Sequence, residues 1–258
     1  MKFGILLTQF LVVMMKKLIL IFCLLLLTTV ANSQSQQFFD SPFGGGGGFT
    51  ADWTFTNVNS LNNKLVSINM PQVASKGIFT SGGGGFIYIG FVPGFRVGGM
   101  GYGGSTSNKS TLSDPNGLLY NSETQYSCGG GGLTVEYTLP FIKSIGVSPG
   151  LIIGGGNTTV ELYQNRWEMT WNNLGANTNS YLNFHKTLKN NYWIISPTLN
   201  VDIPFYRFLC FRVGVGYNFT LSEEWKLDND QSISNVPSDF NGRNFFIQSG
   251  ILIGFFSF

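Results

Sequence analysis

The sequence predicts an all-β fold: an up-and-down antiparallel transmembrane β-barrel of about eight strands, with a short helix in its first long loop. Three observations support this. Charged residues make up only 11% of the chain, against about 25% in ordinary soluble domains. After residue 33 no apolar stretch approaches the ~20 residues of a transmembrane helix. Segments of alternating apolar and polar residues recur, and closing such strands into a barrel satisfies every backbone group in lipid.

The first segment, residues 1–33, has the pattern of a secretory signal peptide. Two lysines precede a long apolar run, which ends in small residues. We expect cleavage after Ser33, with cleavage after Ala31 as the second choice. Residues 1–13 lie upstream of the pattern, so a later methionine is a candidate start. The alternative is that 5–30 is retained as a membrane anchor.

The mature chain then comprises a short N-terminal segment, 34–42, and a barrel domain, 43–258. The signal carries three of the 15 basic residues, which leaves 12 against 13 acidic residues and a net charge of −1. Nothing in this balance suggests nucleic acid. Only Cys128 and Cys210 remain, far apart along the predicted strands, so two free thiols are expected. No metal-ligand spacing occurs, and no cofactor is expected.

The strands follow from the alternation and from the turns between them. The clearest alternation is in 211–222, where Phe, Val, Tyr and Leu occupy the odd positions and Arg, Gly, Asn, Thr and Ser the even ones. The expected strands are about 43–56, 78–91, 94–105, 122–139, 146–165, 191–204, 210–223 and 244–258.

The predicted connections alternate strictly between short and long. The short ones are 91–94, 139–146 and 203–210. The long ones are 57–77, 106–121, 166–190 and 224–243. In an up-and-down barrel this places all long loops on one rim, as in bacterial outer-membrane barrels, which have short periplasmic turns and long extracellular loops.

The C-terminal sequence "GILIGFFSF" ends in an aromatic residue, Phe258. With the loop pattern, it resembles the small eight-stranded outer-membrane barrel family of bacteria over about 43–258. The chain is also similar to uncharacterised glycine-rich bacterial proteins that share "GGGG-x-x-Y-I-G" (82–90) and "VEYTLPF" (135–141). The resemblance implies a bacterial outer-membrane location, contact with outer-membrane lipid, and recognition of Phe258 by the barrel-assembly machinery.

An eight-stranded barrel has an interior filled by side chains, so a wide pore is not expected. If Val201 and Val213 face lipid, four charged residues on neighbouring strands face inward. Buried charges need partners. We therefore expect an internal ion cluster that closes the periplasmic half, with Arg96 paired to Glu136 and Asp202 paired to Arg212. The alternative is a proton or ion pathway.

Glycine runs at 82–85, 129–132 and 154–156, with further glycines between 98 and 104, fall at similar depth on consecutive strands. They should form one patch where the wall curves sharply or another segment packs closely.

The first long loop contains the predicted helix. Its apolar positions at helical spacing are Val58, Leu61, Leu65 and Ile68. Asn57 or Ser60 should cap it, and Pro71 limits its length. The helix either covers the glycine patch from inside or rests on the rim.

The stretch 157–192 predicts a hairpin that projects beyond the membrane. Trp167, Met169 and Trp171 share one face of it, which is a candidate contact surface for a protein or glycan partner. The alternative is that they lie at the lipid interface. Catalysis would need a positioned Ser–His pair. His185 is the only histidine, and no motif frames it or the nearby Ser180.

We therefore expect a non-enzymatic cell-envelope barrel with a structural or surface-interaction role. One alternative is an outer-membrane enzyme that acts on lipid or peptide. The other is an exported, soluble, lipocalin-like binder of an apolar ligand, which would need an apolar interior.

Overall fold

The computed structural model describes residues 44–113, 117, 119–140, 145–165, 183–206 and 208–255. Several predictions fall outside the described residues: the signal peptide at 1–33, the segment 34–42, the contact surface at Trp167, Met169 and Trp171, and the terminal Phe258. No helix in the described ranges is long and apolar enough to cross a membrane.

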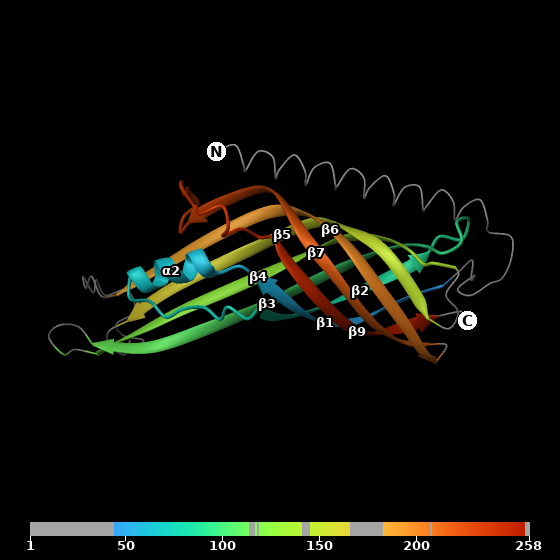
Figure 1. Cartoon of the computed structure of the whole chain (residues 1–258), viewed down its shortest axis with the longest axis horizontal. Helices are drawn as coiled ribbons and strands as arrows, with labels where there is room; N and C mark the ends of the chain where they lie inside the picture. The colour runs from blue at the N-terminus through green and yellow to red at the C-terminus, as the bar shows by residue number, and fades with distance from the viewer. Residues whose placement is uncertain are drawn as a thin grey trace, which may run out of the picture. The chain divides into compact units, whose positions relative to one another are not determined.

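Eight long strands of the described chain form one closed antiparallel barrel (Figure 1). The first and last of them, β1 and β9, pair to close it. The strands are β1 (Gly45–Thr56), β2 (Ile78–Tyr88), β3 (Phe95–Ser113), β4 (Leu119–Tyr137), β5 (Gly146–Asn165), β6 (Phe184–Tyr206), β7 (Leu209–Leu227) and β9 (Asn244–Phe255). A two-residue strand, β8 (Gln231–Ser232), pairs with the end of β7. The predicted fold class is confirmed.

Three strands are longer than predicted, and one of them, β7, ends at Leu227 instead of 223. β3 continues to Ser113 instead of ending near 105, and β6 begins at Phe184 instead of 191. The additional part of β3 is polar on both faces, so it carries no apolar stripe, yet it pairs with β4 up to Ser113 and Leu119. The predicted long loop 106–121 is therefore mostly a β-hairpin.

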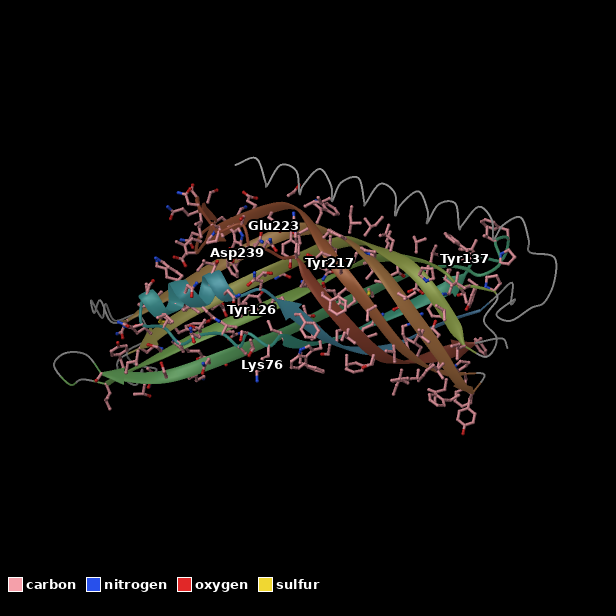
Figure 2. All side chains as sticks on the ribbon, in the orientation of Figure 1. Lys76, Tyr126, Tyr137, Tyr217, Glu223 and Asp239 are labelled. Atoms are coloured by element: carbon pink, nitrogen blue, oxygen red, sulfur yellow. The ribbon has the colours of Figure 1, made fainter. Side chains whose placement is uncertain are left out.

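The faces of the strands separate polar from apolar side chains. Thr80, Ser196 and Asn218 point inward and are almost fully buried. Residues of the opposite parity face outward, such as Trp193 and Ile253, which are 63% and 64% exposed. Figure 2 shows the side chains along the barrel. The barrel is thus polar inside and apolar outside.

The glycines of β2 to β5 form one continuous patch, as predicted. Gly83, Gly101, Gly131 and Gly155 are successive cross-strand partners. The patch also extends onto β1, where Gly47 and Gly48 pair with glycines of β2. We call this region the glycine wall.

Neighbouring strands approach one another closely at several points of the glycine wall. A Cβ atom on Gly98 would overlap the carbonyl oxygen of Gly85, and one on Gly154 would overlap that of Gly131. Real side chains do not fit there, so close strand approach explains why glycine occupies these positions.

The first long loop contains α2 (Asn59–Ser67), as predicted. The predicted capping residues are wrong, because the N-cap is Val58, which has no side-chain capping bond. Asn57 instead accepts the backbone N–H of Asn59 through Oδ1 at 3.2 Å. Ser60 instead donates to Asp239 at 2.6 Å.

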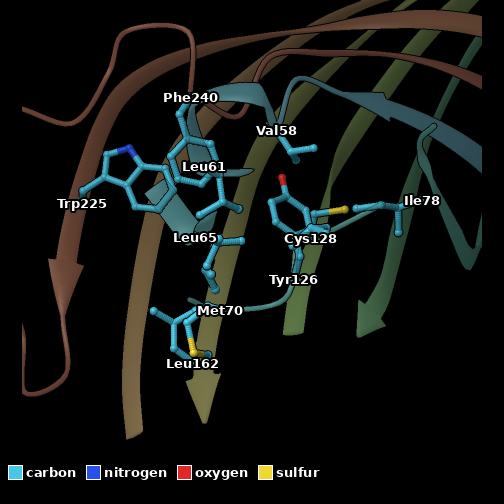
Figure 3. Packing of buried hydrophobic residues seen from close by; sticks show 12 residues of the cluster. Val58, Leu61, Leu65, Met70, Ile78, Tyr126, Cys128, Leu162, Trp225 and Phe240 are labelled. Atoms are coloured by element: carbon cyan, nitrogen blue, oxygen red, sulfur yellow. The ribbon is translucent and has the colours of Figure 1, made fainter. Parts of the chain in front are cut away.

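The apolar face of α2 closes the end of the barrel that carries the long loops (Figure 3). There it packs against inward-facing side chains of β4, β5 and β7 and against the loop before β9. The core of this mouth cluster comprises Val58, Leu61, Leu65, Met70, Val73, Ile78, Tyr126, Cys128, Val160, Leu162, Trp225 and Phe240. Ile68, predicted for the same face, is 40% exposed. The helix thus lies against bulky side chains of the interior.

Candidate functional site

Arg96, Glu136, Asp202 and Arg212 meet inside the barrel, and we call them the charge ring. Arg96 on β3 and Glu136 on β4 are cross-strand partners, with Nη2 and Oε2 2.6 Å apart. Asp202 on β6 and Arg212 on β7 are also cross-strand partners, with Oδ1 and Nε 2.7 Å apart. These are the two pairs that the strand parity predicted.

Contacts across the bore join the two pairs. Arg96 Nη1 lies 2.6 Å from Asp202 Oδ2, and Arg212 Nη1 lies 3.1 Å from Glu136 Oε1. The strands concerned are not neighbours, because β5 separates β4 from β6. Each carboxylate therefore bridges both guanidinium groups, and the ring as a whole carries no net charge. Strand parity did not reveal these contacts, since it describes only neighbouring strands.

An aromatic ring and a small cavity border the charge ring. The guanidinium carbons of Arg96 and Arg212 lie 4.2 Å and 5.0 Å from the centroid of Phe86, the geometry of a cation–π contact. A cavity of about 20 Å³ touches Glu136 and Arg212. That is room for about one water molecule. Side chains therefore fill this level of the bore.

The outer end of the barrel is extended on one side. β1 ends at Thr56 and pairing of β2 with β3 ends at Ser81 and Gly103, whereas β3 and β4 remain paired to Ser113. β3 to β7 therefore project as a sheet beyond the shorter strands, since β7 stays paired with β6 up to Leu227. Along its free edge, Asn108 on β3 donates to the backbone carbonyl of Gln72 at 2.9 Å. This contact ties the first loop to the projecting sheet.

A polar groove of about 400 Å³ lies on this projecting sheet. Its lining residues are Lys109, Ser110, Thr111, Asn121, Ser122, Glu123, Tyr163 and Asn165. Lys109 Nζ and Glu123 Oε2 are 3.1 Å apart, in a largely exposed ion pair. The groove thus offers hydroxyls, amides and both signs of charge beside one aromatic ring.

His185 stacks on the tyrosine of that groove. The rings of Tyr163 and His185 are 4.3 Å apart between centroids and inclined by 6°. The imidazole Nε2 lies 3.1 Å from the hydroxyl of Thr187. Ser180 is outside the described residues, so its distance from His185 is not defined.

Cys128 and Cys210 are both free, as predicted, and both are buried. Cys128 belongs to the mouth cluster, whereas Cys210 packs with Phe86 and Leu252 near the charge ring. The two thiols therefore lie at different depths of the barrel.

Comparison with known proteins gives architectural likeness only. No protein-family model matches the sequence, and no curated protein matches it. Ail of Yersinia pestis, solved with the heparin analogue sucrose octasulfate, is 8% identical with a TM-score of 0.40, over 83% of this chain and 97% of that one. A major outer membrane protein from Thermus thermophilus is 10% identical with a TM-score of 0.40, over 82% and 99%.

The outer membrane protein OprG from Pseudomonas aeruginosa is 10% identical with a TM-score of 0.34, over 83% of this chain and 94% of that one. At these scores the likeness carries no functional argument. What the chain itself shows is a closed eight-stranded antiparallel barrel with a polar, charge-lined interior and an apolar exterior.

Proposed function

We propose that this chain is a small outer-membrane barrel with a closed bore, which acts as a structural or surface-interaction protein and not as a pore or an enzyme. The observation that carries the proposal is that side chains fill the bore at two separate levels. The charge ring occupies the level with the 20 Å³ cavity. The mouth cluster fills the opposite end.

The membrane setting is supported by the outer surface of β6, β7 and β9. Trp193, Leu221 and Ile251 all point outward and are more than half exposed, which is stable only against lipid. A soluble lipocalin-like carrier would show the reverse pattern, with an apolar interior. The buried Arg212 and Asn200 of this interior argue against an apolar ligand.

The projecting sheet supports a surface-interaction role. It presents the polar groove around Tyr163 next to the stacked His185. Aromatic faces combined with amide and hydroxyl groups suit a hydrated partner, such as a glycan or a polar protein surface.

The closed bore is tested by reconstituting the mature chain into liposomes and measuring swelling in solutions of small sugars. We expect swelling no faster than that of empty liposomes. As a matched variant, Leu61→Ala with Leu65→Ala thins the mouth cluster but leaves the charge ring intact, and it too should stay closed. Rapid swelling of the unmodified protein would refute the proposal.

The surface role is tested on a glycan array and in a cell-adhesion assay. The variant replaces residues 109–123 with a tight turn, because Asn108 and Thr124 are cross-strand partners and can be joined directly. Binding in either assay should require the projecting sheet. If the unmodified and shortened proteins behave alike in both assays, the surface-interaction role is wrong and only the structural role remains.

The absence of catalysis is tested with His185→Ala. We expect lipid and peptide profiles of cells that produce the variant to equal those of cells that produce the unmodified chain. A change in lipid acylation or peptide processing that depends on His185 would instead favour the enzyme alternative.

A further inference from the structure

Asp52 is a buried carboxylate that no described residue pairs. Its side chain is 3% exposed, and neither Oδ1 nor Oδ2 has a hydrogen-bond partner among the described residues. It faces inward from β1, directly opposite Thr80 of β2 and Gln248 of β9. A buried ion without a partner is strongly destabilising. This position therefore requires either a proton on the carboxyl group or a cation beside it.

The other buried charges cannot supply it. In the described ranges, the buried charged side chains are Asp52 and the four members of the charge ring. The ring contains two arginines and two carboxylates, all engaged with one another. An ionised Asp52 thus gives the described interior one uncompensated negative charge, which a proton or one monovalent cation would neutralise.

Gln248 is the cross-strand partner of Asp52, and a chain of hydrogen bonds identifies which of its amide atoms donates. Glu136 can only accept, so Asn200 must present its Nδ2 to it, at 2.8 Å. The Oδ1 of Asn200 therefore accepts, and Gln248 donates to it through Nε2 at 2.5 Å. The remaining atom, Gln248 Oε1, is buried and has no hydrogen-bond partner in the described chain.

Thr50 adds a third oxygen. It lies two residues before Asp52 on the inward face of β1, is 5% exposed, and its Oγ1 also lacks a partner among the described side chains and backbone. Thr50 and Gln248 both line the 20 Å³ cavity, whose lining also includes Glu136 and Arg212 of the charge ring but not Asp52. The side-chain atoms without a partner in the described chain on these facing positions of β1 and β9 are therefore all oxygens, and one residue among them is a carboxylate.

We propose that Asp52, Gln248 and Thr50 form a binding site for a small monovalent cation, with sodium as the probe. Hard cations prefer carboxylate, carbonyl and hydroxyl oxygens. A divalent ion would reverse the charge imbalance instead of removing it. A proton on Asp52 would neutralise the carboxylate but would satisfy only one acceptor, whereas a cation binds all three oxygens.

The test compares thermal unfolding of the full mature chain, refolded into detergent micelles in sodium chloride or in choline chloride at equal ionic strength. We expect a Tm about 5–10 °C higher in sodium chloride once sodium exceeds its Kd about a hundredfold. Elemental analysis after desalting should find one sodium ion per barrel.

Asp52→Asn keeps the shape and removes the charge, so the sodium dependence should vanish and the Tm in choline chloride should rise. Thr50→Val removes one donor oxygen and should reduce the shift. Ser122→Ala is the control, because Ser122 is another buried hydroxyl without a partner in the described chain, on β4 and away from β1, and it should keep the full shift.

Equal Tm values in the two salts for the unmodified chain would overturn the proposal. So would a sodium dependence that Asp52→Asn leaves intact, or a stability gain in Asp52→Asn that is the same in both salts, which would indicate a proton or water at the carboxylate. If Asp52→Asn fails to fold, Thr50→Val decides: a shift equal to that of Ser122→Ala refutes the site.

Discussion

The charge ring and the mouth cluster fill the same bore by opposite means. The charge ring fills its level of the bore with four ion pairs between side chains that are at most about 10% exposed. The mouth cluster fills the other end of the bore with aliphatic and aromatic side chains packed around α2. Ion pairs depend on direction and on an exact balance of charge, whereas apolar packing depends mainly on volume. The two ends should therefore respond differently to substitution.

The largest effect on the free energy of unfolding is expected from replacing one residue of the charge ring. Arg96→Met should lower the free energy of unfolding by about 3–5 kcal/mol, because it leaves a buried carboxylate without its partner. Urea unfolding in lipid vesicles measures this. The control is Lys109→Met, which removes a cation that is 73% exposed and should change stability by less than about 1 kcal/mol. Equal losses for the two variants would show that the ring contributes no more than a surface pair.

A somewhat smaller effect on the free energy of unfolding is expected from substitutions in the mouth cluster. Leu65→Ala should cost about 2–4 kcal/mol through the cavity it leaves, whereas Leu65→Met should cost less than about 1.5 kcal/mol. Val66→Ala, on the exposed face of α2, is the matched control. If Leu65→Met is as harmful as Leu65→Ala, the mouth depends on shape as strictly as the ring does and the contrast fails.

The glycine wall provides a test of what keeps the strands together around both ends. Gly154→Ala should cost about 1–3 kcal/mol, since the new methyl group would overlap a backbone carbonyl of β4. Gly155→Ala is the control, because the nearest heavy atom there is 3.8 Å away. Heat-dependent gel mobility and urea unfolding compare the two. Similar costs at both positions would mean that conformational freedom, and not close approach, explains the glycines.

The smallest effect is a pH dependence of local stability at the tip of the projecting sheet. Asp228 accepts the backbone N–H of Thr187 at 2.8 Å and lies 2.9 Å from Lys186 Nζ, and these contacts hold the pKa of its carboxyl below the usual range. A lowered pKa means that the contribution is present at neutral pH and is lost as the pH falls through the folded-state value. Amide hydrogen exchange at Thr187 should therefore increase only in acid. Asp228→Asn should show the increase at neutral pH.

Alternation along single strands was sufficient to predict most of the fold and both ring pairs, because each depends on parity between neighbours. Contacts between distant strands were not accessible in this way, and neither was the second half of β3, since its residues are polar on both faces. Asp52 shows the same limit. It alternates with Trp53 as any inward residue would, but the sequence does not show that its cross-strand partner is Gln248, whose Oε1 has no hydrogen-bond partner among the described residues.

The two buried thiols have a practical consequence. Cys128 is 7% exposed and belongs to the mouth cluster, whereas Cys210 is 1% exposed and lies near the charge ring. A thiol-reactive dye will therefore label each sulfur only when its own end of the cylinder opens. Labelling kinetics on the unmodified polypeptide would therefore measure the opening rate of each end separately, without any engineered reporter.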